Sequence, residues 1–226
     1  MTFVFSPPMQ AAVPVANSSE LFPVHRIYCV GRNYADHAKE MGGTGREAPF
    51  FFMKPADAVL PVAKGSIGTM PYPSVTSDLQ HEIELVVAIG TGGKDIAVDD
   101  AAAHIWGYAI GLDMTRRDLQ GEAKKLGRPW STGKGFDCSA PIGPIHRSVP
   151  GPGITLTVNG GVRQQSTLEK MIWNVAETIA QLSTLFALQP GDLIYTGTPE
   201  GVAAVVSGDL LVGKIDGLGS LQVRIA

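Results

Sequence analysis

The segment QHEIELVVAI, residues 80–89, predicts a β-strand because it is apolar, rich in Val and Ile, and followed by Gly90. Side chains in a strand alternate between two faces, so Glu82 and Glu84 are expected to point the same way, roughly 7 Å apart. Two carboxylates this close repel each other, and one takes up a proton unless a cation lies between them. Mg²⁺, Mn²⁺ or Ca²⁺ would meet that need, since these ions prefer carboxylate oxygens. The alternative is a half-buried antiparallel strand whose wet face carries two glutamates.

Composition sets broad limits on the kind of protein. The chain has 226 residues, 27 of them Gly and 16 Pro, a mixture that favours many short strands joined by tight turns over a helical bundle. The net charge is −3 and no basic run occurs, which argues against nucleic acid or an anionic membrane surface as a partner. Two cysteines are too few for a disulfide scaffold, and Cys29, in an apolar run, is expected in the core.

The N-terminal residues indicate neither secretion nor membrane insertion. They have no basic region, and prolines at positions 7, 8 and 14 interrupt them. No apolar run approaches the ~20 residues that a membrane-spanning helix requires. A cytoplasmic location is therefore expected. Residues 1–25 are predicted to form an irregular arm on the surface, and residues 26–226 a single domain.

The next segment carries candidate catalytic groups. Asn33 is a suitable N-cap for a short helix over residues 34–41. His37 and Glu40 are three residues apart on that helix and so share a face. The glycine-rich segment 42–47 could tether the helix as a moving lid. The alternative is a solvent loop with a chance His/Glu pair.

A third carboxylate, Asp113, is a candidate functional group. Residues 106–112 predict another buried strand, and Asp113 follows it directly, at the rim of a sheet where ligands and catalytic groups commonly lie. Thr115 could cap the helix that follows. Arg117 and Gln120 share a face of that helix beside Asp113.

A lysine between two glycines is the next candidate. The spacing around Lys134 is not that of a phosphate-binding P-loop. Flanking glycines let the backbone come close, so the ammonium is expected to point at another group, and Asp137 could orient it. The turn Thr196-Gly197-Thr198-Pro199 follows a predicted strand at residues 193–195 and could bind an anion, although a plain turn is equally compatible.

The remaining signals are structural. Residues 154–158 and 162–165 predict a hairpin around the favoured turn pair Asn159-Gly160. Helical spacing of apolar residues over 172–185 predicts an amphipathic helix whose core face consists of Ile172, Val175, Ile179, Leu182 and Leu185.

Five motifs in this order resemble the fumarylacetoacetate hydrolase family. They are GRNYADH at 31–37, HEIE at 81–84, DMTRRDLQ at 113–120, KGFD at 134–137 and TGTP at 196–199. The resemblance runs from about Arg26 to the C-terminus. Within the family, the short chain resembles the acylpyruvate hydrolases. FFFMKPAD at 50–57 and the pair Arg116-Arg117 resemble the fumarylpyruvate hydrolases of gentisate breakdown.

The resemblance implies a fold, a metal and an assembly. The fold would be α+β but mostly β, a mixed β-roll or sandwich with a few short helices, and the protein would form a homodimer. Mg²⁺ or Mn²⁺ would be held by Glu82, Glu84 and Asp113. The implied reaction is hydrolysis of a C–C bond in a 2,4-dioxo acid.

The resemblance and the chemistry of that reaction together assign roles to side chains. His37, oriented by Glu40, would take a proton from water, since imidazole titrates near neutral pH. Lys134 would stabilise the oxyanion that forms on the acyl carbonyl. The remaining candidates would bind substrate. Arg117, Gln120 and Thr198 would hold the pyruvoyl end, and Arg32 and Arg116 would hold a distal carboxylate. Asp137 would bind substrate beside Lys134.

Two other functions remain open. Decarboxylation of oxaloacetate or a related oxo acid, or its tautomerisation, would use the same metal and enolate without water activated by His37. A non-catalytic metal-binding protein on the same fold is the second. It would be expected to lack His37, Glu40 or Lys134, and all three are present.

Overall fold

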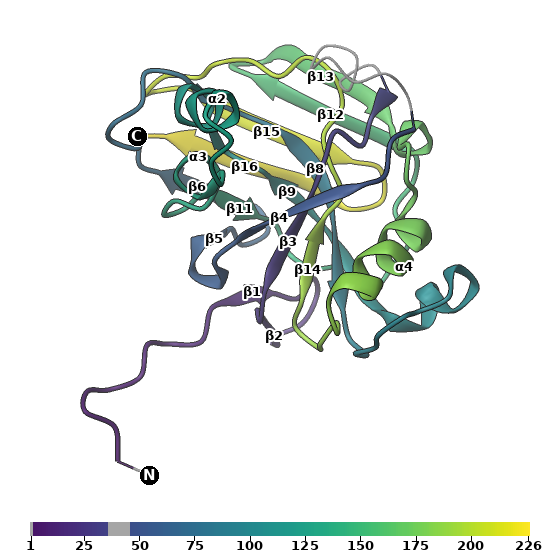
Figure 1. Cartoon of the computed structure of the whole chain (residues 1–226). Coiled ribbons are helices and arrows are strands. Elements are labelled where there is room, and N and C mark those ends of the chain that lie inside the picture. Colours follow the sequence, from purple (N-terminus) through teal and green to yellow (C-terminus); the bar gives the residue numbers. More distant parts are fainter. Residues whose placement is uncertain (1, 36–45) are drawn as a thin grey trace.

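Two β-sheets form the body of the protein, as Figure 1 shows for the computed structural model, which describes residues 2–35 and 46–226. The larger sheet has seven strands in the order β4-β3-β14-β8-β9-β11-β5. The smaller has five, in the order β13-β12-β15-β16-β6. The predicted mostly β fold with few helices is confirmed.

The strands of the larger sheet are β3 (Ile27–Gly31), β4 (Phe50–Lys54), β5 (Val59–Pro61), β8 (Ile83–Ile89), β9 (Ile105–Leu112), β11 (Ala140–Ile142) and β14 (Leu193–Tyr195). Those of the smaller are β6 (Ile67–Met70), β12 (Gly153–Val158), β13 (Gly161–Thr167), β15 (Leu210–Ile215) and β16 (Gly219–Ile225). Short segments between them are η1 (Ala56–Ala58), η2 (Val98–His104) and η3 (Leu168–Lys170). None of the described helices is long and apolar enough to cross a membrane.

The predicted strand around Glu82 and Glu84 lies in the middle of the larger sheet. β8 pairs antiparallel with β14 on one side and β9 on the other, and all of its residues are buried. It begins at Ile83, later than predicted, because Gln80 belongs instead to the two-residue strand β7 (Leu79–Gln80), which pairs with β10 (Thr115–Arg116). Leu85 packs in the core between the two sheets, among residues of β12, β15 and β16.

The predicted hairpin and amphipathic helix are both present. β12 and β13 pair antiparallel around Asn159-Gly160. Helix α4 (Val175–Leu185) begins with a capping box between Asn174 and Glu177, and it packs on the larger sheet through Ile179 and Leu182 (Figure 1). Two of the residues predicted for the core face of this helix do not belong to it. Ile172 precedes the helix, and Leu185 is 62% exposed.

The N-terminal residues are more ordered than predicted. β1 (Ala12–Pro14) and β2 (Leu21–Pro23) form a hairpin, and the side chains of Val13 and Phe22 are buried in a core shared with β3 and β8. The prediction of an irregular surface arm is therefore wrong for this part. Residues 2–11, before β1, contain no strand or helix, and this end of the chain projects away from the sheets in Figure 1. The extent of a single domain over residues 26–226 stays a prediction.

Candidate metal centre and active site

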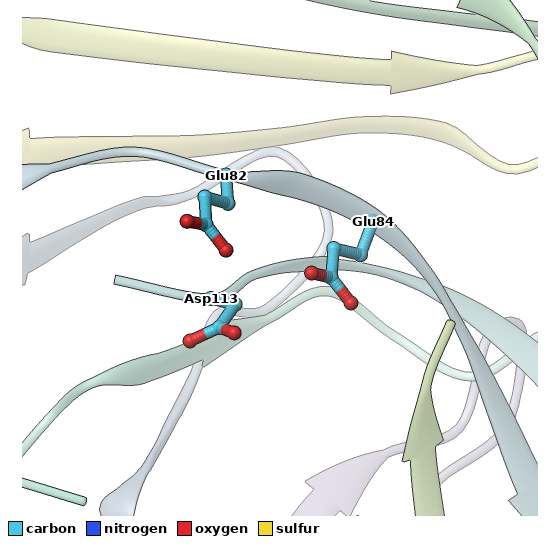
Figure 2. Close-up of side chains that lie close together, drawn as sticks. All are labelled: Glu82, Glu84 and Asp113. Carbon is cyan, nitrogen blue, oxygen red and sulfur yellow. The ribbon is translucent and has the colours of Figure 1, made fainter. Parts of the chain in front are cut away.

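Strand register brings two distant carboxylates together. Ile83 of β8 lies opposite Leu112 of β9, so the residues just outside this pair, Glu82 and Asp113, also face each other. The Asp113 amide donates to the Glu82 carbonyl at 2.8 Å. Opposite residues of an antiparallel pair project from the same face. Since side chains alternate along β8, Glu84 joins them, and Figure 2 shows the three carboxylates turned toward one another.

The three carboxylates could hold one cation. Glu82, Glu84 and Asp113 each offer an oxygen, and these oxygens lie within 4.8 Å of one another. All three residues are buried, with exposures of 6%, 1% and 1%. The alternative of a wet strand face with two glutamates is therefore wrong. Buried carboxylates need compensation by positive charge.

Part of that compensation comes from three side chains. The Lys134 ammonium lies 2.8 Å from Glu82 Oε2 and 2.7 Å from Asp113 Oδ2. Arg117 pairs with Glu82 Oε1, and the Lys54 ammonium lies 2.8 Å from Asp113 Oδ1. Within the described residues, three cations thus pair with two of the three carboxylates, Glu82 and Asp113.

Glu84 differs from its two neighbours. Its Oε2 accepts a hydrogen bond from the Gly197 amide at 2.8 Å, and it forms no ion pair with the described residues. Burial above all raises the pKa of this carboxyl well above its ordinary value, and the Asp113 and Glu82 carboxylates raise it further. A divalent ion would remove that penalty by placing positive charge beside Glu84. The donor set therefore fits an oxygen-preferring ion such as Mg²⁺ or Mn²⁺.

Lys134 lies at the end of a short helix rather than in the predicted loop. Helix α3 (Ser131–Lys134) follows α2 (Arg117–Lys125), and Lys134 is 2% exposed. A Cβ on Gly133 would lie 2.9 Å from the backbone N of Gln120, so glycine lets the two helices approach. The ammonium does point at other groups, as expected. Burial by itself lowers the pKa of Lys134, but Asp113 and Glu82 together raise it above its ordinary value, so the ammonium keeps its proton.

Arg117 and Gln120 share a face of α2 as predicted. Arg117 donates from Nη1 to Gln120 Oε1 and from Nε to Gln80 Oε1, both at 2.7 Å. Thr115 does not cap this helix, because α2 begins at Arg117 without a side-chain cap. The Thr115 hydroxyl donates instead to the Asp113 carbonyl at 3.1 Å.

The turn over residues 196–199 closes one side of the carboxylate cluster. Gly197 has a φ of +95°, a left-handed conformation that glycine adopts without strain, and this directs its amide to Glu84. The Thr198 hydroxyl donates to the Ile83 carbonyl at 2.7 Å and accepts from Gln164 Nε2 at 2.8 Å. Of the two predicted possibilities, the turn does bind an anionic group, but that group is a carboxylate of the protein.

A narrow cavity opens beside the carboxylates. Glu82, Glu84, Arg117, Gln120 and Thr198 line it, together with Arg32. Two predicted substrate contacts lie elsewhere. Arg116 does not line the cavity, and its guanidinium lies 4.4 Å from the centre of the Phe136 ring. Asp137 is exposed, and among the described residues Lys134 pairs with Glu82 and Asp113, so the expectation that Asp137 orients the lysine is wrong.

His37 and Glu40 lie outside the described residues, as does most of the proposed lid over residues 34–47. Their assignment as general base and orienting carboxylate therefore rests on the motif and on the chemistry alone.

Sequence reasoning missed three residues of the site. Lys54 ends strand β4 and is 1% exposed beside Asp113, but the sequence marks it only as the end of an apolar strand. Gln164 accepts from the Ile83 amide at 3.1 Å and contacts the His81 ring at 2.9 Å, so it supports the start of β8 from the other sheet. Lys124 lines the cavity from α2, and no pattern in the sequence singled it out.

A mostly β fold that gathers three buried carboxylates and a buried lysine beside one cavity has the donor set of a divalent-cation site. The fumarylacetoacetate (FAA) hydrolase C-terminal family matches residues 26–226. The chain belongs to the fumarylacetoacetate hydrolase family.

Two relatives and one solved structure carry more specific names. A fumarylpyruvate hydrolase of Ralstonia sp is 48% identical over 184 residues, which are 79% of this chain and 93% of the relative. An oxaloacetate tautomerase of Escherichia coli (strain K12) is 39% identical over 210 residues, 90% of this chain and 94% of the relative. The crystal structure of fumarylpyruvate hydrolase from Pseudomonas aeruginosa in complex with Mn²⁺ and pyruvate is similar with a TM-score of 0.97 and 54% identity, over 100% of this chain and 99% of that one.

Proposed function

We propose that the protein is a divalent-metal-dependent hydrolase that cleaves the C–C bond of an acylpyruvate, with fumarylpyruvate as substrate and fumarate and pyruvate as products. The observation that carries the proposal is the cluster of Glu82, Glu84 and Asp113, buried within 4.8 Å of one another beside Lys134. The similarity to two fumarylpyruvate hydrolases, one with Mn²⁺ and pyruvate bound, supports the metal and the substrate.

The reaction has a simple balance. A water oxygen adds to the acyl carbonyl carbon, the bond from that carbon to the pyruvoyl methylene breaks, and the pyruvoyl unit leaves as an enolate. A proton taken up by the enolate gives pyruvate. A divalent ion held by Glu82, Glu84 and Asp113 would bind the substrate's carboxylate and 2-oxo oxygen and stabilise the negative charge that develops there.

Lys134 can donate a hydrogen bond to the second negative charge of the reaction, the oxyanion on the acyl carbonyl. An ammonium carries three N–H groups, and two of them are directed at Glu82 and Asp113. The third has no hydrogen-bond acceptor among the described residues and would donate to the oxyanion that forms on the acyl carbonyl when water adds. Because its pKa is raised, Lys134 stays charged at neutral pH.

The proton on the attacking water requires a base. We assign this role to His37, with Glu40 holding the imidazole ring. Arg117, Gln120 and Thr198 surround the pyruvoyl end. Arg117 is already held in place by Gln80 and Glu82, so little ordering is required when substrate binds.

A second candidate function is tautomerisation or decarboxylation of oxaloacetate. The similarity to an oxaloacetate tautomerase of Escherichia coli favours keeping it. These reactions share the enolate but need no activated water. The discriminating experiment assays the purified protein with Mg²⁺ or Mn²⁺, and with EDTA, on fumarylpyruvate, acetylpyruvate and oxaloacetate. Metal-dependent turnover of oxaloacetate without hydrolysis of either acylpyruvate would contradict the proposal.

We also propose a homodimer. Phe3, Phe5 and Met9 on the projecting N-terminal residues are 66%, 78% and 96% exposed, and apolar side chains in this number are typical of a segment that packs on another chain. A cytoplasmic location stays a prediction.

Removing residues 2–9 should shift the protein toward the monomer, because the apolar contacts with the second copy would be lost. Size-exclusion chromatography with light scattering measures this. Leu185→Gln, which removes an exposed apolar side chain from α4, should leave the assembly unchanged. A wild-type monomer at micromolar concentration would contradict the homodimer, and an unchanged dimer after truncation would contradict the role of these residues.

A further inference from the structure

Two cations at the cavity form no ion pair with the described residues. Arg32 follows β3 in a left-handed conformation, with a φ of +55°, and its Nε is buried without a hydrogen-bond partner. A left-handed backbone is unfavourable for arginine, so the surrounding structure holds this side chain at the cavity against a local cost. Lys124 reaches the same cavity from α2, and its ammonium lies 4.9 Å from the centre of the Trp130 ring.

The other cations of the site are already used. Lys54, Lys134 and Arg117 pair with Glu82 and Asp113, two of the carboxylates that would hold the metal. Arg32 and Lys124 are therefore surplus positive charge in a partly buried place. Burial above all, and then Arg117 and Arg32, lowers the pKa of Lys124 to about 8. Such crowding of like charges is unfavourable unless an anion binds between them.

We propose that Arg32 and Lys124 bind a second carboxylate at the far end of the acyl group, and so select acylpyruvates whose acyl part is itself an acid. This inference rests on the proposed hydrolase function. It replaces Arg116 with Lys124 in the distal subsite, because Arg116 lies over Phe136 and does not line the cavity.

The walls of the cavity suit such an acyl group. Phe50, Phe52 and Trp130 also line it, and flat aromatic side chains pack well on a planar conjugated chain. The cavity has a volume of about 30 Å³, room for a water molecule rather than a substrate. Binding therefore requires side chains at the rim to move, and the long stem of Lys124 allows this at little cost.

The test compares two substrates that differ at the far end. Lys124→Met keeps the length and helix preference of the side chain but removes the charge. It should lower kcat/KM for fumarylpyruvate about 10- to 100-fold, the range for loss of a charged hydrogen bond, and change acetylpyruvate less than about 3-fold. Lys125→Met, at the neighbouring exposed lysine, should change neither. Equal losses on both substrates after Lys124→Met would overturn the assignment.

Arg32 is tested with a residue that tolerates the left-handed backbone. Arg32→Asn should likewise lower kcat/KM for fumarylpyruvate more than for acetylpyruvate. In the double variant, the fold-loss of kcat/KM for fumarylpyruvate should be smaller than the product of the two single fold-losses, because both cations hold one carboxylate. Fully multiplicative losses would show that the two residues act independently and would contradict a shared subsite.

Direct binding separates this inference from the proposed function. Fumarate and crotonate differ by a carboxylate in place of a methyl group, and calorimetry with the Mg²⁺-loaded protein measures both. Lys124→Met should weaken the binding of fumarate about 10-fold or more and leave the binding of crotonate unchanged. This result would support the subsite even if the wild type hydrolysed no acylpyruvate, and an unchanged fumarate affinity would overturn it even if hydrolysis were confirmed.

Discussion

Replacing Glu84 by Gln should lower hydrolysis at least ~10³-fold, since a ligand that positions the metal would be lost and the metal contributes several kcal/mol to the transition state. The same change should stabilise the protein without metal. Glu84 is buried without an ion pair to the described residues, and glutamine can still accept the hydrogen bond from Gly197. A variant that loses activity while its metal-free form becomes more stable would separate the metal site from the fold.

The raised pKa of Glu84 also predicts how the stability of the metal-free protein changes with pH. The pKa of Glu84 is raised in the folded protein, so the folded state binds more protons than the unfolded state above the ordinary value of 4.5. The free energy of unfolding of the metal-free wild type should therefore fall as pH rises above that value. Mg²⁺ or Mn²⁺ should restore it by binding the folded state. Glu84→Gln should lack both effects.

Thermal unfolding in EDTA and in metal, across that pH range, measures these effects together with activity. Glu122→Gln, at an exposed glutamate of α2, is the matched control and should behave as wild type. Asp113→Asn should lose activity but destabilise the metal-free protein, because Asp113 pairs with Lys54 and Lys134. Near-parental activity of Glu84→Gln in Mg²⁺ would contradict the metal assignment.

Replacing His37 by Ala should lower hydrolysis by ~10²-fold or more, the usual scale for loss of a general base. Hydrolysis requires a proton to be taken from water beside the acyl carbonyl. Decarboxylation and tautomerisation of oxaloacetate pass through the same enolate without that water, so they should be much less affected. The ratio of the two activities measures the role of His37 independently of any general loss of folded protein.

Two further variants sharpen the comparison. Glu40→Ala should cost less than His37→Ala, because its effect is indirect, through orientation of the ring. His104→Ala should leave the ratio unchanged, since His104 lies on η2 and does not line the cavity. If His37→Ala hydrolyses fumarylpyruvate at close to the parental rate, the base is another group.

Local patterns predicted the parts of the site that depend on local geometry. Alternation along extended chain is enough to place Glu82, just before β8, and Glu84 on one face, because the side chains of a strand have a period of two residues. The end of a buried strand predicted that Asp113 lies at the rim of a sheet, and the family resemblance implied that it joins Glu82 and Glu84. Arg117 and Gln120 share a helix face at a spacing of three, as the helical period requires.

Predictions failed where contacts depend on segments far apart in the chain. Residues 12–23 contain prolines and no period, yet they form a hairpin because their few apolar side chains find a core made by β3 and β8. Lys54 ends a strand and could have faced either solvent or the interior. Asp137 follows Lys134 closely in sequence but is exposed, since the chain turns away after α3.

Strand period, glycine content and the order of the motifs can be read along the chain, and they were enough to predict the mostly β fold and to single out Glu82, Glu84, Asp113 and Lys134. Tertiary structure alone decided the register that sets Glu82 opposite Asp113, a pairing that no local pattern specifies. It also decided which cations are neutralised and which are not. Helical spacing does not say whether Lys124 faces solvent or the cavity, and the tertiary structure places it at the cavity with its ammonium 4.9 Å from the centre of the Trp130 ring.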